Sequence, residues 1–119
     1  MRSGFNNQNV YNCMGGVIPL SSSPIVTLCG STKFKDLFLK VAQDFTLNGW
    51  IVLMPGVFGH ADGFEWTDEQ KQNLDKLHLE KIRMSNAIFV LNYEGYIGES
   101  TKKEIEYAKL IGIPIYTYE

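Results

Sequence analysis

The stretch Ile25-Val26-Thr27-Leu28-Cys29-Gly30-Ser31-Thr32-Lys33 decides the fold of this chain. Its first five residues are mostly apolar and are ended by a glycine and two hydroxyl residues, which predicts a strand covered on both faces. The residues that follow are apolar at spacings of three and four, which predicts an amphipathic helix ending near Asn48. A buried strand that leads directly into a helix is the first half of a βαβ unit.

The same pattern continues to the end of the chain. Further apolar strands are expected at 50–54, 87–91 and 115–118, and further helices at about 67–84 and 100–111. Thr67 and Gln70 have the spacing of a capping box. The alternation β-α-β-α-β-α-β predicts right-handed crossovers. We therefore expect a three-layer α/β domain, Rossmann- or flavodoxin-like, with a short, mostly parallel sheet of four to five strands.

Residues 1–24 differ in composition from the rest of the chain. Asparagine, glycine and serine are frequent in this segment, and a Ser-Ser-Ser-Pro run closes it, a composition that buries little apolar surface. We therefore divide the chain into a flexible N-terminal arm, 1–24, and an α/β domain, 25–119. Because four strands leave an open edge, we expect either that 17–20 add an edge strand or that a second subunit covers the edge, in a homo-oligomer of two or more chains.

The charge balance argues against a polyanionic partner. Eleven basic and thirteen acidic side chains give a net charge of −2, which does not favour binding to a nucleic-acid polymer. We expect no membrane association and a cytoplasmic location, because the chain has neither a signal-peptide pattern nor the roughly 20 consecutive apolar residues that span a bilayer. Cys13 and Cys29 have no metal-ligand spacing and suggest no disulfide framework.

The loop after the first strand has the composition of an anion site. Gly30 allows close backbone approach to a ligand, Ser31 and Thr32 supply hydroxyls, and Lys33 adds a positive charge at the start of a helix. In open α/β sheets, ligands bind beyond the carboxyl ends of the strands, where this loop is expected. The alternative is purely structural, with Ser31 or Thr32 as the N-cap that follows a turn glycine.

The loop before the last helix carries Gly98, Ser100, Thr101 and Glu104. Ser100 or Thr101 is expected to cap the helix, and Glu104 lies at capping-box distance from Thr101, which is a structural role for that carboxylate. The alternative follows from the helical face that Glu104 shares with Ile105 and Ala108, which must pack inward. On that interpretation Glu104 points over the sheet into the crevice, where a carboxylate is costly unless it has a function.

Two histidines and three aromatic residues carry weaker signals. His78 lies among apolar residues of the second helix, where a histidine is more often structural than catalytic, and the His60-Ala61-Asp62 run is too short for a metal site. We expect no metal ion and no cofactor. Three aromatic residues of the long loop expected at about 56–67 could stack on a base or pack on their own domain. They are Phe58, Phe64 and Trp66.

Three sequence motifs together resemble those of a known protein family. The first strand ends in Cys-Gly-Ser at 29–31, Ser-Asn-Ala at 85–87 precedes a hydrophobic strand, and Gly-Glu-Ser-Thr-Lys-Lys-Glu-Ile-Glu-Tyr-Ala at 98–108 is followed by Gly-Ile-Pro at 112–114. Together they resemble the nucleoside 2-deoxyribosyltransferase superfamily, which includes the deoxynucleoside 5′-monophosphate N-glycosidases. The likeness covers roughly 25–119, and the run 98–108 is its most specific part.

This resemblance implies a chemistry for Glu104. It implies that Glu104 attacks the anomeric carbon of a nucleoside or nucleotide, releases the base and holds a glycosyl ester until a second base or water takes over. It also implies a set of substrate-binding residues, in which His78 stands where the family carries an acidic side chain. The set consists of Gly30, Ser31, Thr32, Lys33, His78, Gly98, Ser100 and Thr101.

Some positions depart from the family pattern. Thr27 stands where a tyrosine usually accompanies the nucleophile, and Asn86 replaces an acidic residue before the third strand. Protonation of the leaving base would then fall to Asp62, Glu65 or Asp75. The functional hypothesis is an N-glycosyl transferase or hydrolase. A non-catalytic nucleotide-binding module and a glycohydrolase of NAD or a related nucleotide remain alternatives.

Overall fold

The computed structural model describes residues 23–119 as an alternation of strands and helices. In chain order the elements are β1 (Ile25–Cys29), η1 (Thr32–Phe34), α2 (Lys35–Leu47), β2 (Ile51–Leu53), α3 (Gly59–Asp62), α4 (Asp68–Arg83), β3 (Ala87–Val90), η2 (Tyr93–Gly95), α5 (Glu99–Ile111) and β4 (Ile115–Thr117). The four strands and three long helices therefore lie where the apolar patterns predict them. The expected arm, apart from Ser23 and Pro24, and the expected edge strand at 17–20 lie outside the described residues.

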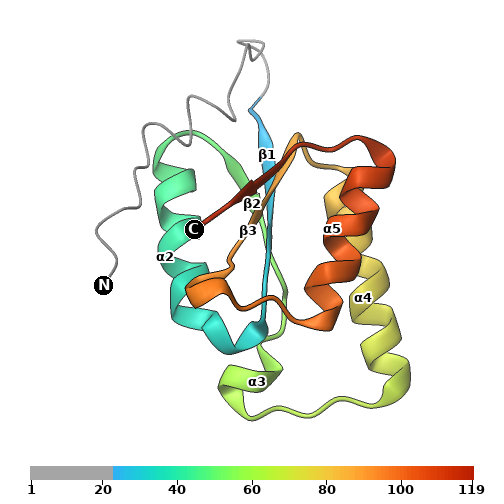
Figure 1. Ribbon diagram of the computed structural model, residues 1–119. Coiled ribbons are helices and arrows are strands. Elements are labelled where there is room, and N and C mark those ends of the chain that lie inside the picture. Colours follow the sequence, from blue (N-terminus) through green and yellow to red (C-terminus); the bar gives the residue numbers. More distant parts are fainter. Residues whose placement is uncertain (1–22) are drawn as a thin grey trace.

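The described strands form one parallel sheet in the order β2-β1-β3-β4. In register, Val26 lies opposite Val52 on one side and Ala87 on the other, and Ile88 lies opposite Ile115. Helix α2 covers one face of the sheet, and α4 and α5 lie side by side on the other (Figure 1). This arrangement confirms the predicted three-layer α/β architecture, with four strands that are all parallel.

Alternation along β1 divides the core between the two faces of the sheet. Val26 and Leu28 belong to the cluster under α2, together with Phe45. Cys29 belongs to the opposite cluster, with Ile82 of α4 and with Ala108 of α5. The last side chain of β1 therefore lies beneath α4 and α5.

Helix α4 begins as its sequence predicts. The Thr67 hydroxyl accepts a hydrogen bond from the Gln70 backbone N–H at 3.1 Å, and the Gln70 side-chain oxygen accepts one from the Thr67 N–H at 2.9 Å. Both halves of the capping box are present. This confirms the predicted start of α4, which carries one wall of the site described below.

Helix α5 begins earlier than its sequence predicts. Its N-cap is Gly98, which has an extended backbone with φ −78° and ψ 172° and offers no side-chain cap. Ser100 and Thr101 lie within the first turn, so the predictions that either caps α5 and that Thr101 forms a capping box with Glu104 are wrong. Two hydroxyl residues in succession suggested a cap, but the backbone is already helical at Glu99. Glu104 therefore lies in the second turn, beyond reach of a capping role.

The long loop after β2 contains a helical turn that the sequence did not predict. This is α3, which ends at Gly63 with a positive φ of 68°. Phe58 precedes it and is buried against α2, with its ring 5.2 Å from that of Phe38. Contacts between α3 and η1 hold the turn below the sheet, where the strands end (Figure 1).

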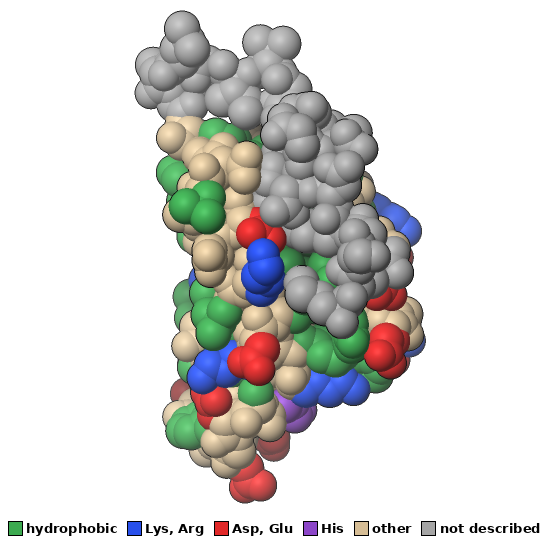
Figure 2. Space-filling view, turned by 90° about the vertical axis from the view of Figure 1, so that its left-hand side faces the viewer, with side chains coloured by type: hydrophobic (Ala, Val, Ile, Leu, Met, Phe, Trp, Pro, Cys, Tyr) green, Lys and Arg blue, Asp and Glu red, His purple; other side chains and the backbone are tan. Residues whose placement is uncertain are grey.

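The surface near α2 mixes charges of both signs. On the described part of the face shown in Figure 2, basic and acidic side chains are interspersed with apolar ones. Lys35 pairs with Asp62 at 2.9 Å, and Lys40 pairs with Asp44 at 2.8 Å. Over 23–119, no helix combines the length and the apolar character needed to cross a membrane.

Candidate functional site

A cavity of about 310 Å³ opens at the carboxyl ends of the strands. Its walls come from the loops after β1 and β2, from α4, and from the first turns of α5. Its lining includes Gly30, Ser31, Thr32, His60, Trp66, Lys71, Asp75, His78, Lys81, Tyr96, Gly98, Glu99, Ser100, Thr101 and Glu104. The crevice expected from the topology is therefore present, and it joins both of the loops that the sequence singled out.

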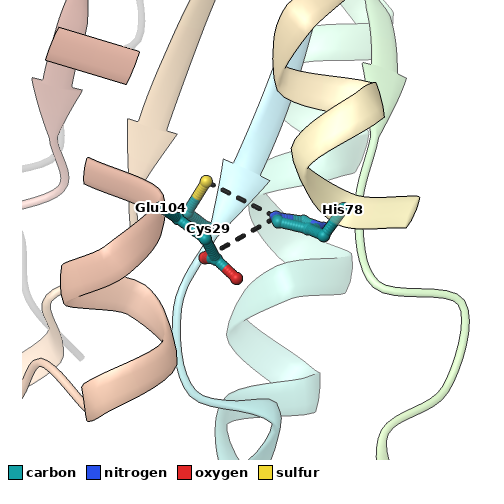
Figure 3. A group of neighbouring side chains, drawn as sticks. All are labelled: Cys29, His78 and Glu104. Carbon is teal, nitrogen blue, oxygen red and sulfur yellow. Dashed lines mark hydrogen bonds and ion pairs between the residues drawn. The ribbon is translucent and has the colours of Figure 1, made fainter. Parts of the chain in front are cut away.

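Three side chains from three elements lie close together (Figure 3), and two of them, His78 and Glu104, line this cavity. Cys29 ends β1, His78 lies on α4 and Glu104 lies on α5. The His78 Nε2 atom lies 3.5 Å from Cys29 Sγ and 3.7 Å from Glu104 Oε1. Cys29 is fully buried, and the side chains of His78 and Glu104 are 7% and 13% exposed. We call these three residues the Cys–His–Glu cluster.

Burial governs the protonation of the cluster. It raises the pKa of Glu104 to about 8, with a further rise from the negative charge of Asp75 that outweighs the hydrogen bond from the Cys29 thiol. Burial and the nearby charge of Lys81 lower the pKa of His78 to about 4. Burial also raises the pKa of the Cys29 thiol well above its ordinary value. Near neutral pH the histidine is therefore uncharged, and its contact with Glu104 is not an ion pair.

The position of Glu104 removes its purely structural explanation. The carboxylate lies in the second turn of α5, with no free helix-start N–H to bond, and it points inward to His78 rather than outward to solvent. Ionisation of a carboxyl group that is largely buried is costly. Such a group is a candidate for function on physical grounds.

The loop after β1 has mixed roles. Gly30 packs so closely on Leu91 that an added Cβ would lie 3.1 Å from the Leu91 Cβ. The Ser31 hydroxyl accepts a hydrogen bond from the Lys33 N–H at 3.3 Å, as the N-cap interpretation predicts. The Thr32 hydroxyl is 2.8 Å from Nδ1 of His60. Structural demands thus account for part of this loop, although three of its residues line the cavity.

Lys33 lies apart from the other predicted substrate-binding residues. Its ammonium stands 3.6 Å from the centre of the Tyr96 ring and 5.2 Å from that of Phe34. It is not part of the cavity lining. The structure therefore brings together seven of the eight predicted substrate-binding residues and leaves Lys33 on the outer side of Tyr96.

The first turn of α5 is tied to α4 by a lysine. Lys71 donates to the Ser100 hydroxyl at 3.0 Å and pairs with Asp75 at 2.6 Å. Thr101 is buried, with 2% of its surface exposed. The backbone N–H groups in the first turn of α5 lack partners within the helix, and this helix end borders the cavity.

Of the three carboxylates suggested to protonate the leaving base, only one lines the cavity. Asp62 pairs with Lys35 at 2.9 Å outside the lining, and Glu65 is not part of the lining either. Asp75 lines the cavity. Among the three loop aromatics, Trp66 lines the cavity, whereas Phe58 is in the core and Phe64 is 52% exposed.

The positions that depart from the family pattern have structural partners. The Thr27 hydroxyl lies 2.6 Å from the Ser85 hydroxyl, and both are buried. The Asn86 side-chain oxygen accepts a hydrogen bond from the Ile25 N–H at 2.7 Å. Both contacts link β1 to the segment between α4 and β3, at the end of the sheet opposite the cavity.

Sequence reasoning missed Cys29, Lys71 and Lys81 as parts of the site. A signal for the two lysines was present, because Lys71, Asp75, His78 and Lys81 follow one another at spacings of three and four and therefore share one face of α4. Cys29 ends an apolar run and gave no such signal, since nothing in the sequence shows which residues lie above it.

Comparison of the chain with protein-family models and with curated proteins finds no match. The likeness to the deoxyribosyltransferases therefore rests on the three sequence motifs alone.

Proposed function

We propose that this chain cleaves or transfers at the N-glycosidic bond of a nucleoside or nucleotide, with Glu104 as the nucleophile. The observation that carries the proposal is a largely buried carboxyl group that lies beside His78 and lines a cavity at the carboxyl ends of a parallel sheet. The geometry of α5 excludes a role for Glu104 as a helix cap, and His78, which is uncharged near neutral pH, forms no ion pair with it there.

A carboxylate suits this chemistry because bond cleavage at a sugar C1 builds positive charge on the ring. An adjacent carboxylate stabilises that oxocarbenium-like state and then captures it as an ester. Low solvent exposure strengthens the interaction, since the surroundings of Glu104 screen charge less than water does. The ester forms as the C1–N bond breaks, and the electron pair of that bond leaves with the base.

The cavity offers suitable contacts for the rest of a nucleoside. Its volume, about 310 Å³, lies at the lower end of the range of small-molecule sites, about 300–1,000 Å³. Trp66 and Tyr96 provide aromatic surface for a base. The first turn of α5 and the Ser100 hydroxyl provide donors for sugar hydroxyls or an anionic group.

A non-catalytic nucleotide-binding module is the second candidate, and a specific observation favours it. Asp75 is the one suggested helper carboxylate in the cavity, and it is already paired with Lys71 at 2.6 Å. Protonation of the leaving base then requires Asp75 to exchange that partner for a proton. If this exchange is too costly, the cavity binds its ligand without cleaving it.

A panel assay separates these functions. The protein is incubated with nucleosides, deoxynucleoside monophosphates and NAD, with and without an acceptor base, and free base is measured by chromatography. We expect base release from at least one compound, and a loss of about 1,000-fold or more in Glu104→Gln with little change in ligand affinity. Glu106→Gln, on the exposed side of the same helix, is the matched control and should keep full activity.

Two outcomes would contradict the proposal. Binding without base release by the wild type supports the binding module instead, and turnover of Glu104→Gln near the wild-type rate rejects Glu104 as the nucleophile.

A further inference from the structure

The Cys–His–Glu cluster has the donor types of a metal site. Sγ of Cys29, Nε2 of His78 and a carboxylate oxygen of Glu104 all lie within 4.8 Å of one another. Thiolate, imidazole and carboxylate are the three side-chain ligands that Zn²⁺ accepts in proteins. The ligand positions 29, 78 and 104 are far apart in the chain, which is why a spacing rule does not find them.

The separations match a tetrahedral ion. Zinc–ligand bonds of about 2.0–2.3 Å at tetrahedral angles place neighbouring ligand atoms about 3.3–3.6 Å apart. The measured separations are 3.5 Å between Sγ and Nε2 and 3.7 Å between Nε2 and Oε1. The separation between Nε2 and Oε1 is too long for a hydrogen bond. It is nevertheless close to the distance expected between two ligand atoms of one zinc ion. The third separation, between Sγ and a carboxylate oxygen of Glu104, is no more than 4.8 Å.

The surroundings supply rigidity, access and charge balance. The three ligands sit on a strand end and two long helices rather than on mobile loops. His78 and Glu104 line the cavity, which gives an ion an entry path and leaves a fourth coordination position facing the ligand space. One thiolate and one carboxylate neutralise the charge of a divalent cation. The two lysines in the lining have acceptors of their own, Lys71 with Asp75 and Lys81 with the Met54 carbonyl at 2.8 Å.

We propose that Cys29, His78 and Glu104 bind one Zn²⁺ ion, with the fourth position open to the cavity. Binding forms Zn–S, Zn–N and Zn–O bonds and releases to solvent the thiol proton and any proton held by the Glu104 carboxyl. The site itself is independent of the proposed function. One consequence rests on that function: a carboxylate that ligates zinc is unavailable to attack a sugar, so zinc occupancy and glycosyl transfer exclude one another.

The test measures metal binding without any substrate. The full chain is freed of metal with a chelator and titrated with Zn²⁺ against a chromophoric chelator, and with Co²⁺ to record the thiolate-to-metal absorption band. We expect one ion per chain and a thiolate band with Co²⁺. Cys29→Ser and Glu104→Gln should each weaken binding by about 100-fold or more, beyond the effect of losing an outer-shell contact, and Cys29→Ser should abolish the band.

The chain provides its own matched controls, because it has two cysteines and two histidines. Cys13→Ser and His60→Gln should leave both affinity and spectrum unchanged, whereas His78→Gln should weaken binding as the other ligand variants do. Circular dichroism of each metal-free variant confirms that it is folded, and Glu104→Gln preserves side-chain shape should Cys29→Ser fail this check. Absence of stoichiometric binding by the wild type overturns the proposal, as does binding lost equally in the Cys13 or His60 variants.

The exclusion of catalysis by zinc is examined separately. If base release is found, added Zn²⁺ should inhibit it in proportion to occupancy, and chelator should restore it. If no base release is found, the proposed function is rejected and the result of the metal titration still stands. If base release persists at full zinc occupancy, only the claim that zinc binding and catalysis exclude one another is rejected.

Discussion

At the scale of single residues, the main feature is the proton affinity of Glu104. Burial raises its pKa to about 8, against an ordinary value of 4.5. His78 beside it is shifted the other way, to about 4. The two groups therefore affect rate and stability in separate pH ranges, which allows their contributions to be distinguished.

The pH dependence of base release follows from the ionisation of Glu104. Only the carboxylate attacks, so in metal-free conditions kcat/KM should rise about tenfold per pH unit below about pH 8 and level off above it. Steady-state rates on the best substrate of the panel measure this profile. A flat profile between about pH 6 and pH 8 would mean that Glu104 is ionised throughout this range or does not take part.

The free energy of unfolding should decline between about pH 6.5 and pH 8. Between about pH 6.5 and 8 the folded chain holds a proton on Glu104 that the unfolded chain has lost, so the free energy of unfolding falls as pH rises, by at most about 1.4 kcal/mol per pH unit. Below about pH 6.5, His78 acts in the opposite sense, because the unfolded state then takes up the proton that the buried imidazole refuses.

Urea unfolding at several pH values, with chelator present, measures this decline. Glu104→Gln should flatten the profile above about pH 6.5, and Glu106→Gln should keep the wild-type slope. An unchanged slope in Glu104→Gln would assign the pH dependence to another group.

At the scale of helices and strands, sequence patterns predict an element well where a single pattern applies to it. The apolar runs of β1 and β3 and the periodicity of α2 predict these elements well, because a buried strand and an amphipathic helix impose different periods. The start of α4 was also predictable, since Thr67 and Gln70 satisfy each other without tertiary help. The start of α5 was not, because Gly98 and two hydroxyl residues compete for the cap and only the backbone decides between them.

The capping box of α4 should contribute measurably to stability. Thr67→Ala removes the acceptor of the Gln70 N–H and should lower the free energy of unfolding by about 1 kcal/mol. Thr67→Ser keeps the hydroxyl and should retain most of that stability. Urea unfolding at a pH near neutral makes the comparison. Equal losses in the alanine and serine variants would assign the effect to the Thr67 methyl group instead of the cap.

Part of the candidate site was predictable from the sequence. The loop at 30–33 and the segment 98–104 were expected at one place because strand ends in a parallel sheet share an edge. The place of Cys29 beside Glu104 was not expected, since no local pattern encodes which residues of other elements lie above the end of β1, and His78 was expected at the site only through the family resemblance. Lys33 shows the converse: its charge suggested an anion site, yet its ammonium lies on the Tyr96 ring.

At the scale of the whole molecule, the described surface includes exposed apolar side chains on α4, at its C-cap and on α5. Leu77, Met84 and Leu110 are 56%, 55% and 82% exposed. Strand β2 also stands at an edge of the described sheet, with Ile51 47% exposed. Such features favour association in water.

We therefore expect the chain to form a homo-oligomer of at least two copies. Light scattering coupled to size exclusion, at micromolar concentration, should return a mass of two or more chains. A mass of one chain across the accessible concentration range would contradict this expectation and leave the exposed side chains of α4 and α5 without a partner copy.

The claim on which the account rests is that Glu104 forms a covalent ester with the sugar, and trapping that ester tests it most directly. Metal-free protein is mixed with the best substrate of the panel, quenched in acid during turnover, digested and mapped by mass spectrometry. We predict a sugar adduct on the peptide that carries Glu104, absent from Glu104→Gln and present in Glu106→Gln. Rapid base release with the adduct on another residue, or by Glu104→Gln at the wild-type rate, would contradict the account.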